Sequence, residues 1–410
     1  MEKRNYIPSF LVAYLLSLGG LNHIMGIVLG KSDGIMIMNL VPVAAVLVLH
    51  FFISDKKNDL NMNKKALLFV YYIVSIIICY KYAIRKTTLH YEEVFVYCLI
   101  PIYISFYKIN VETVLKWMLF FSVLIIPISN DFFKVVTAGY ETIGMSTTYN
   151  ILPFVVAAAI HFVYYRKKAG FWLWLGYGIN VYYLLKVILL GNRGPIISLV
   201  AFAILVIMHR MDSEGTIKKS TGKNIFITLT VGITAIVVID NIESILLSFH
   251  KWLQSMNMEL AFVTKSVRKI GSGDITNGRQ QLFEFVIQGI KEHWFLGNGI
   301  ASITYKSFGR YSYPHNLFLQ MWYDLGIIIS LPLLFVVWKS IRKTVFDYVK
   351  NKDIIAMLIL LFTLSIPRLC YSSEFWVSTT FWFLIMFSIS PNIYENTVEL
   401  STDDREDENK

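Results

Sequence analysis

The side chains best suited to chemistry in this sequence are two arginines and one histidine, each in a short polar segment. Arg193 lies within Gly-Asn-Arg-Gly-Pro, Arg279 within Gly-Arg-Gln-Gln, and His315 within Tyr-Pro-His-Asn. A guanidinium group matches phosphate oxygens in a bidentate way. An imidazole accepts a proton near neutral pH. The combination therefore suits group transfer from a phosphorylated substrate.

The arginines also have an ordinary alternative role as residues that snorkel to a membrane interface. Arg193 is flanked by glycines rather than by other bases, and glycines let a backbone approach a ligand closely. Arg279 opens an expected helix, whose positive dipole end favours anions. We therefore expect Arg193 and Arg279 to bind an anion such as a lipid pyrophosphate, with Asn192 as a neighbouring contact.

His315 could equally cap the outer end of a membrane span. Its setting favours a catalytic role, because Pro314 constrains the preceding turn and Asn316 adds an amide beside it. We expect His315 to be catalytic and Asn316 to bind substrate. No second histidine or carboxylate stands three or four residues after His315, so neither a metal nor a cofactor is expected.

The elements that must position these residues are membrane helices. Of 410 residues, 55% are hydrophobic and 16% are charged, and the mean hydropathy is +0.55, whereas soluble chains are about a quarter charged. This composition excludes a soluble enzyme, a disordered chain and a coiled coil. The net charge of +10 comes from basic clusters between apolar runs, which indicates topology rather than nucleic-acid binding. The three cysteines form no Cys-x-x-Cys pair, so no disulfide framework or thiolate site is indicated.

The apolar runs predict an all-α polytopic bundle of about twelve spans. Residues 1–391 form a single transmembrane bundle, and 392–410 form an acidic cytoplasmic tail. The expected spans are 7–30, 35–54, 66–84, 93–107, 111–128, 149–165, 171–190, 195–209, 225–247, 315–338, 354–370 and 374–391.

Basic clusters predict the orientation of the bundle. Lysines and arginines concentrate in the segments that are cytoplasmic if the N-terminus is cytoplasmic, such as 56–65, 166–168 and 339–352. By the positive-inside rule both termini face the cytoplasm. Lys186 lies inside a span near its external end, where it could snorkel outward or reach the site.

One long segment, 248–314, is expected on the external face between the ninth and tenth spans. Its first part continues the preceding helix, and a second amphipathic helix runs from about Arg279 to His293. Loops of this length are usually functional or disordered. The helical periodicity favours a lid that rests on the membrane surface.

These segments resemble the O-antigen polymerase and O-antigen ligase superfamily, whose members are bacterial membrane glycosyltransferases. The segment around Arg193 looks like the family's Ser-Arg-Gly motif, with Asn192 in place of Ser. Arg279 and the following Gly-Asn-Gly look like its Gly-Arg…Gly-x-Gly motif. His315 opens a segment similar to its His-Asn-x-x-Leu…Glu-x-Gly motif, in which Asp324 replaces Glu. The likeness spans 191–326.

The resemblance implies an inverting, metal-independent transfer of a glycan from undecaprenyl pyrophosphate at the external face of the bacterial inner membrane. Arg193 and Arg279 would hold the pyrophosphate, and His315 would act on the attacking hydroxyl. A carboxylate such as Glu92, Glu93, Asp131 or Glu141 could share or take the role of base.

We expect a polymerase of O-antigen, capsule or another surface polysaccharide, which would join lipid-linked repeat units. The alternatives are a ligase that transfers glycan to lipid A-core and, from another class, a lipid-linked oligosaccharide flippase. A flippase is disfavoured because no internal repeat is visible and the polar cluster is not at the membrane midplane. A structural scaffold would leave Arg193, Arg279 and His315 unexplained. The expected partners are the lipid-linked oligosaccharide, the bilayer, a chain-length regulator and a flippase, without nucleic acid.

Overall fold

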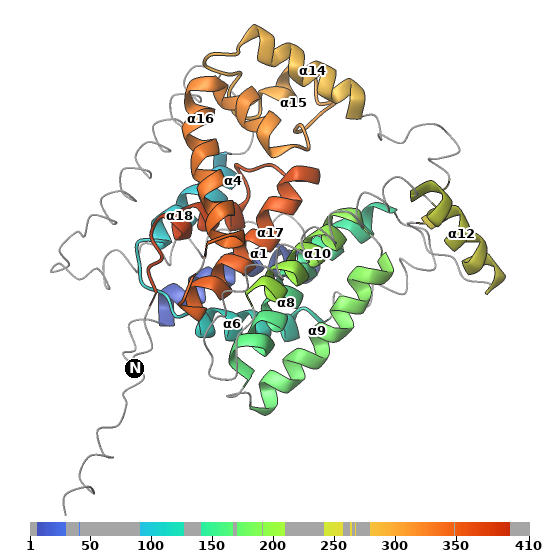
Figure 1. Cartoon of the computed structure of the whole chain (residues 1–410), viewed down its shortest axis with the longest axis vertical. Coiled ribbons are helices and arrows are strands. Elements are labelled where there is room, and N and C mark those ends of the chain that lie inside the picture. Colours follow the sequence, from blue (N-terminus) through green and yellow to red (C-terminus); the bar gives the residue numbers. More distant parts are fainter. Residues whose placement is uncertain are drawn as a thin grey trace, which may run out of the picture.

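The structure is a computed structural model, shown in Figure 1. It describes residues 6–29, 91–126, 141–166, 170–190, 192–209, 242–256, 279–347 and 349–393, together with positions 41, 263–264 and 267. All statements below concern these residues.

The described part of the chain is a helical bundle, which confirms the all-α prediction. Its regular elements are helices, and the described segments add one isolated β-bridge between Ile109 and Ile393. The elements are α1 (Tyr6–Leu29), α4 (Tyr91–Val94), η3 (Phe95–Leu99), α5 (Ile100–Ile104), α6 (Val111–Leu124), α8 (Glu141–Tyr165), α9 (Phe171–Leu190), α10 (Arg193–Met208), α12 (Ile242–Ser255), α14 (Arg279–Glu292), α15 (Ser302–Lys306), α16 (Leu317–Val345), α17 (Lys352–Tyr371) and α18 (Thr379–Ile389).

Four of these helices are long and apolar enough to cross a membrane. They comprise Tyr6–Ile24, Thr147–Tyr165, Leu317–Val345 and Lys352–Tyr371, and shorter apolar helices accompany them. The chain is therefore a multi-pass membrane protein. The count of twelve spans stays a prediction, because the spans expected at 35–54, at 66–84 and over most of 225–247 lie outside the described residues.

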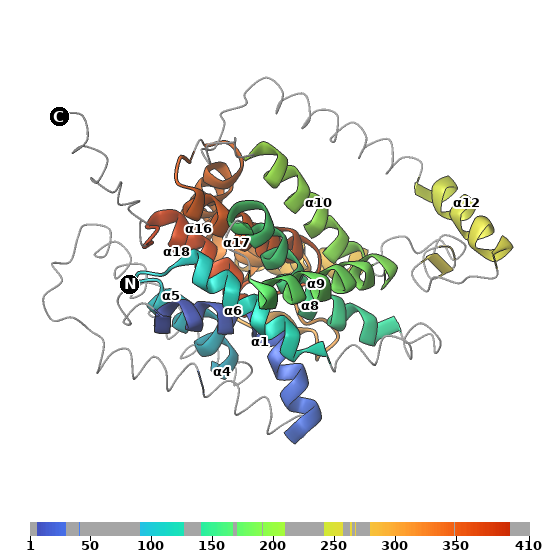
Figure 2. The ribbon, with the colours of Figure 1, turned by 90° about the horizontal axis from the view of Figure 1, so that it is seen from below.

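Helix α17 lies at the centre of the bundle. It packs against α6, α8, α10, α16 and α18, which surround it when the molecule is seen from below (Figure 2). Residues 355–361 of α17 are all buried, so this helix is apolar around its whole circumference, as a central helix requires. By contrast, α16 exposes Leu331, Phe335 and Trp338, which lie on one side of the helix where lipid would cover them.

Helix α16 is broken at Gly326, where φ is 69° and ψ is 175°. Only glycine adopts this backbone conformation readily. The break frees backbone groups that the preceding loop pairs: Asn298 N donates to Tyr323 O at 2.7 Å and Gly299 N donates to Asp324 O at 2.9 Å. The Gly-Asn-Gly motif and the Asp-x-Gly motif thus meet in a backbone joint between the loop and the helix.

Helices α14 and α15 form a small cap over the first turns of α16 (Figure 1). Their apolar sides share a cluster of buried residues, namely Leu282, Val286, Ile290, Ile303 and Tyr323. The amphipathic helix expected from Arg279 to His293 is confirmed as α14. The first part of the long loop is helical in α12, and its expected continuity with the preceding span lies outside the described residues. The glycine-rich stretch between the two helices also lies outside the described residues.

Candidate active site

The C-terminal end of α17 is where two of the sequence motifs meet. Arg279, the first residue of α14, donates from Nη2 to the carbonyl oxygen of Tyr371 at 3.1 Å. His315 also hydrogen-bonds to the backbone of Tyr371. The last carbonyls of a helix have no partner within the helix and carry partial negative charge, so they accept from cationic side chains. Two residues 36 positions apart in sequence are thereby held at one backbone acceptor.

His315 lies in a tight turn directly before α16. Its φ is +56°, a left-handed conformation in which histidine is more common than most residues. Its Nδ1 is buried and has no hydrogen-bond partner in the described part of the chain. In a neutral imidazole one ring nitrogen donates and the other keeps a lone pair.

The surroundings of His315 favour its neutral form. Burial lowers its pKa from the ordinary value, and the positive charge of Arg279 lowers it further, while the bond to Tyr371 partly opposes both effects. Neutral imidazole is the form that can accept a proton. The site therefore keeps His315 in the state that a general base requires at neutral pH.

Tyr313 supports the histidine from the other side. Its ring lies 4.4 Å from the imidazole, centroid to centroid, and its hydroxyl donates to the carbonyl oxygen of Ser372 at 2.8 Å. Burial raises the pKa of Tyr313, so its hydroxyl stays protonated and keeps donating. The Tyr-Pro-His turn is thus fixed to the residues that follow α17.

The backbone at the Arg193 motif lies close to the residues at the C-terminal end of α17. Arg193 is the first residue of α10. A Cβ built at the next residue, Gly194, would lie only 1.8 Å from the hydroxyl of Tyr149, which itself bonds to the side chain of Ser372. Glycine at 194 is therefore what allows α10 to start against Tyr149, beside the residues after α17.

The two asparagines of the motifs have clear structural roles. Asn316 caps α16, because its Oδ1 accepts from the backbone N–H groups of Phe318 at 3.0 Å and Leu319 at 3.1 Å. Asn192 donates from Nδ2 to Thr148 Oγ1 at 2.9 Å, which ties the start of α10 to α8. Substrate binding by either residue stays a prediction.

Asp324, which stands where the family motif has Glu, is also structural in its contacts. It is 2% exposed, and its Oδ2 accepts from Trp376 Nε1 at 2.9 Å and from Gln320 Nε2 at 3.4 Å. A buried carboxylate needs such donors. Asp324 therefore joins α16 to the segment before α18.

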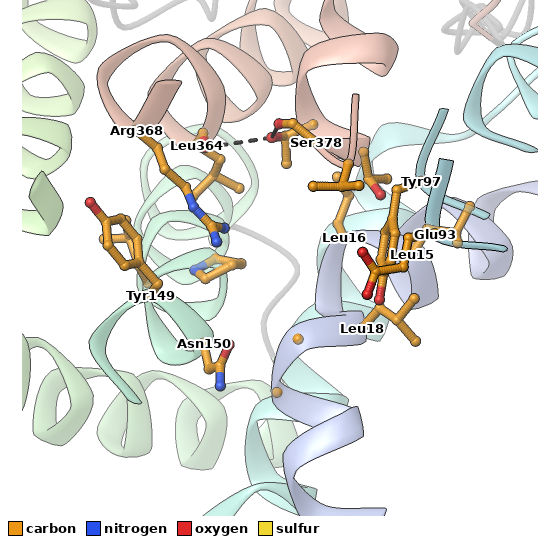
Figure 3. A pocket seen from close by; sticks show the side chains of 17 residues that line it. Leu15, Leu16, Leu18, Glu93, Tyr97, Tyr149, Asn150, Leu364, Arg368 and Ser378 are labelled. Atoms are coloured by element: carbon orange, nitrogen blue, oxygen red, sulfur yellow. Dashed lines mark hydrogen bonds between the residues drawn. The ribbon is translucent and has the colours of Figure 1, made fainter. Parts of the chain in front are cut away.

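The sequence reasoning missed Arg368. Its guanidinium carbon lies 4.7 Å from the centre of the Tyr149 ring, and the side chain lines a cavity of about 260 Å³ (Figure 3). A single cation within an apolar run is a signal for function in membrane helices, and Arg368 gave that signal beside Pro367. Of the candidate carboxylates, Glu93 lines the same cavity. Asp131 lies outside the described residues.

The fold and the site together define a multi-pass membrane protein that gathers arginine and a neutral histidine at one end of its bundle. Residues 178–334 match the family described as O-Antigen ligase. The resemblance to the O-antigen polymerase and ligase superfamily is thereby confirmed over this part of the chain. The match covers Arg193, Arg279 and His315 and leaves Arg368 outside.

The family indicates an O-antigen ligase or polymerase type of function, a glycosyltransferase-like enzyme and a lipid-linked glycan as substrate. It gives no support to a flippase. Searches of curated proteins and of solved structures gave no match.

Proposed function

We propose that the protein is a surface-polysaccharide polymerase that joins undecaprenyl-pyrophosphate-linked repeat units at the external face of the membrane. The observation that carries the proposal is the meeting of Arg279 and His315 at the carbonyl of Tyr371. That contact puts a permanent cation next to an uncharged base. A transfer with an anionic leaving group and a hydroxyl nucleophile needs both.

In the proposed reaction, an acceptor hydroxyl attacks the anomeric carbon of the donor sugar. The bond from that carbon to the pyrophosphate oxygen breaks, and the lipid pyrophosphate leaves with the electron pair. Attack from the face opposite the leaving group inverts the anomeric configuration. Arg279, with Arg193 as the second proposed cation, offsets the charge that develops on the leaving oxygen. The proton of the hydroxyl passes to the neutral imidazole of His315.

The metal-independent chemistry proposed here needs only positioning, charge and one proton acceptor. Pyrophosphate leaves readily once its charge is offset, and a guanidinium group does this without a metal. We propose the ligase reaction, with lipid A-core as acceptor, as the alternative use of the same donor chemistry.

The test is the surface polysaccharide of a deletion strain that carries either the wild-type chain or a variant. Arg279→Gln and His315→Ala are expected to lower chain extension by about 10²-fold or more, as the loss of one charge-stabilising donor or one general base does. A gel of the polysaccharide gives the readout, and an immunoblot of the membranes checks that each variant inserts.

Matched controls come from residues of the same types far from the site. Arg342, which pairs with Asp347 near the other end of α16, and His23 in α1 should tolerate Arg342→Gln and His23→Ala. Single repeat units on the core support the polymerase, whereas long chains left on the carrier lipid support the ligase. Normal polysaccharide ladders from both site variants would contradict the proposed chemistry. Accumulation of the lipid-linked oligosaccharide on the cytoplasmic face of the deletion strain would indicate a flippase instead.

A further inference from the structure

The cavity beside Arg368 lies among α1, α4, η3, α8, α17 and α18. Its volume of about 260 Å³ is slightly below the roughly 300 Å³ at which small-molecule pockets begin. Arg368 projects into it from one side, and Glu93 and Tyr97 lie on the opposite side (Figure 3). Asn150, Ser378 and further small or apolar side chains complete the wall. The cavity thus has a cationic end and an end that offers a carboxylate and a phenol.

Two side chains that line this cavity each contain a polar atom without a hydrogen-bond partner. Nε of Arg368 and Oγ1 of Thr379 are buried and form no hydrogen bond within the described part of the chain. A buried polar atom without a partner is unfavourable, more so when it is charged. Both side chains line a space that can hold a ligand, so each atom would gain a polar partner when its side chain turns toward a bound ligand.

Within the described residues, Arg368 also forms no ion pair. The ion pairs among the described residues join Glu112 to Lys116 and Asp347 to Arg342, and neither includes Arg368. Among the described residues, the guanidinium stacks on the ring of Tyr149, a contact that satisfies no N–H group. A buried cation without an anion is unfavourable, so the missing partner is expected to be negatively charged.

The other end of the cavity limits what that partner can be. Glu93 would repel a second negative group there, while its carboxylate, the Tyr97 hydroxyl and the Asn150 amide can all bond to hydroxyl groups. The ligand that fits both ends carries one oxyanion at the Arg368 end and hydroxyl groups at the other.

We infer that this cavity is a binding site for the sugar end of the lipid-linked substrate, with Arg368 holding an oxyanion of that substrate. The inference rests on the proposed function. The cavity joins the candidate active site through Tyr149, which stacks on Arg368 and bonds to Ser372, whose carbonyl accepts from Tyr313. The oxyanion is either a phosphate of the carrier lipid or a carboxylate of an acidic sugar.

Binding measurements on the purified full-length protein in nanodiscs test this inference. The probes are undecaprenyl diphosphate, which lacks a sugar, and D-glucuronic acid, which lacks a phosphate, with D-glucose as the uncharged comparator. The apparent Kd of each comes from the rise in unfolding temperature with ligand concentration. Arg368→Gln is expected to raise the Kd for one charged probe at least tenfold. The probe affected identifies the source of the oxyanion.

Further variants separate binding from folding. Arg368→Lys keeps the charge but loses the planar fork, so we expect an intermediate Kd. Thr379→Val removes the second unpartnered atom with little change in shape and should weaken binding severalfold. Arg342→Gln removes an arginine that also stacks on an aromatic ring and should leave every Kd unchanged. The unfolding temperature without ligand shows whether each variant folds.

The outcomes distinguish this inference from the proposed function. If Arg368→Gln and Thr379→Val bind both charged probes within twofold of wild type, or if wild type binds neither, the inference is overturned. The transfer defect of Arg279→Gln would still support the proposed function in that case. The converse result is also possible: binding depends on Arg368, but the Arg279→Gln variant extends chains normally. That result would support the inference and contradict the proposed function.

Discussion

His315 shows how one side chain acquires a defined protonation state from its surroundings. The backbone of Tyr371 hydrogen-bonds to the imidazole, Nδ1 has no partner in the described structure, and Arg279 stands close enough to lower the pKa. The arginine therefore has two proposed effects. It offsets charge on the leaving group, and it keeps the nearby imidazole neutral.

This arrangement predicts the pH dependence of the reaction. Because the pKa of His315 is lowered from its ordinary value of 6.5, the neutral base persists into mild acid, and kcat/KM should fall only as the pH drops below 6.5. Arg279→Gln removes a cause of the lowering, so the acid limb of its residual activity should move to higher pH. Arg279→Lys keeps the charge and should leave the limb near its wild-type position.

The measurement is the pH profile of kcat/KM with a lipid-linked donor. A wild-type limb above pH 6.5 would contradict the assignment of His315 as the base. Identical limbs in Arg279→Gln and wild type would show that the arginine does not act on the histidine.

At the residue scale the sequence points to candidate side chains but not to their contacts, and the roles of these side chains stay predictions. Arg279 and His315 were recognised from local motifs, and the structure brings them together. Their shared acceptor is a backbone carbonyl, which has no signature in the identity of residue 371. Arg368 was missed because it lies in a separate apolar run, after the last motif.

At the scale of elements, the break in α16 has the largest structural consequence. Periodicity and hydropathy predict a continuous span here, since Gly326 is followed by an apolar run. The interruption depends on the loop at 294–299, which pairs with the freed backbone: Ile327 N, for example, donates to Trp294 O at 2.8 Å. A break that depends on a contact between distant segments leaves no local pattern around Gly326. The Gly-Asn-Gly and Asp-x-Gly motifs do, however, mark the two segments that meet at the break.

The joint predicts a strong effect of a single methyl group. A Cβ at Gly326 would lie 2.3 Å from Phe295 O, and φ there is 69°. Gly326→Ala should therefore lower the free energy of unfolding by at least the roughly 1–3 kcal/mol that such a backbone conformation costs, and activity should fall as the cap shifts.

Thermal unfolding of the purified protein, followed by circular dichroism, gives the measurement. Gly178→Ala is the matched control, because it lies within α9 and a Cβ there meets nothing within 4 Å. Alanine favours a helix interior, so this control should be neutral or slightly stabilising. Equal unfolding temperatures for the two variants would mean that the joint is not needed for stability.

At the scale of the whole molecule, the candidate site lies at the end of the bundle that α14 and α15 cap, as Figure 1 shows. The basic residues Lys339, Arg342 and Lys343 lie near the opposite end of α16. By the positive-inside rule we expect that end to face the cytoplasm. The site would then face outward, where the proposed lipid-linked donor is used.

Cysteine labelling checks this orientation. In a background without the three native cysteines, Phe308→Cys in the cap and Phe346→Cys after α16 place thiols at positions that are 100% and 73% exposed. We expect a membrane-impermeant maleimide to label position 308 in intact cells and position 346 only after permeabilisation. The reverse labelling pattern would mean that the opposite orientation holds and that the candidate site faces the cytoplasm.

The dependence of the site on the main chain at the C-terminal end of α17 has a bearing on natural variation. The acceptors for Arg279 and Tyr313 are the carbonyls of Tyr371 and Ser372, and every amino acid carries that group. Sequences could drift at these two positions without disturbing either contact. A one-residue insertion or deletion near 371–372 would shift both carbonyls. The length of this segment would therefore be constrained more tightly than the identity of its residues.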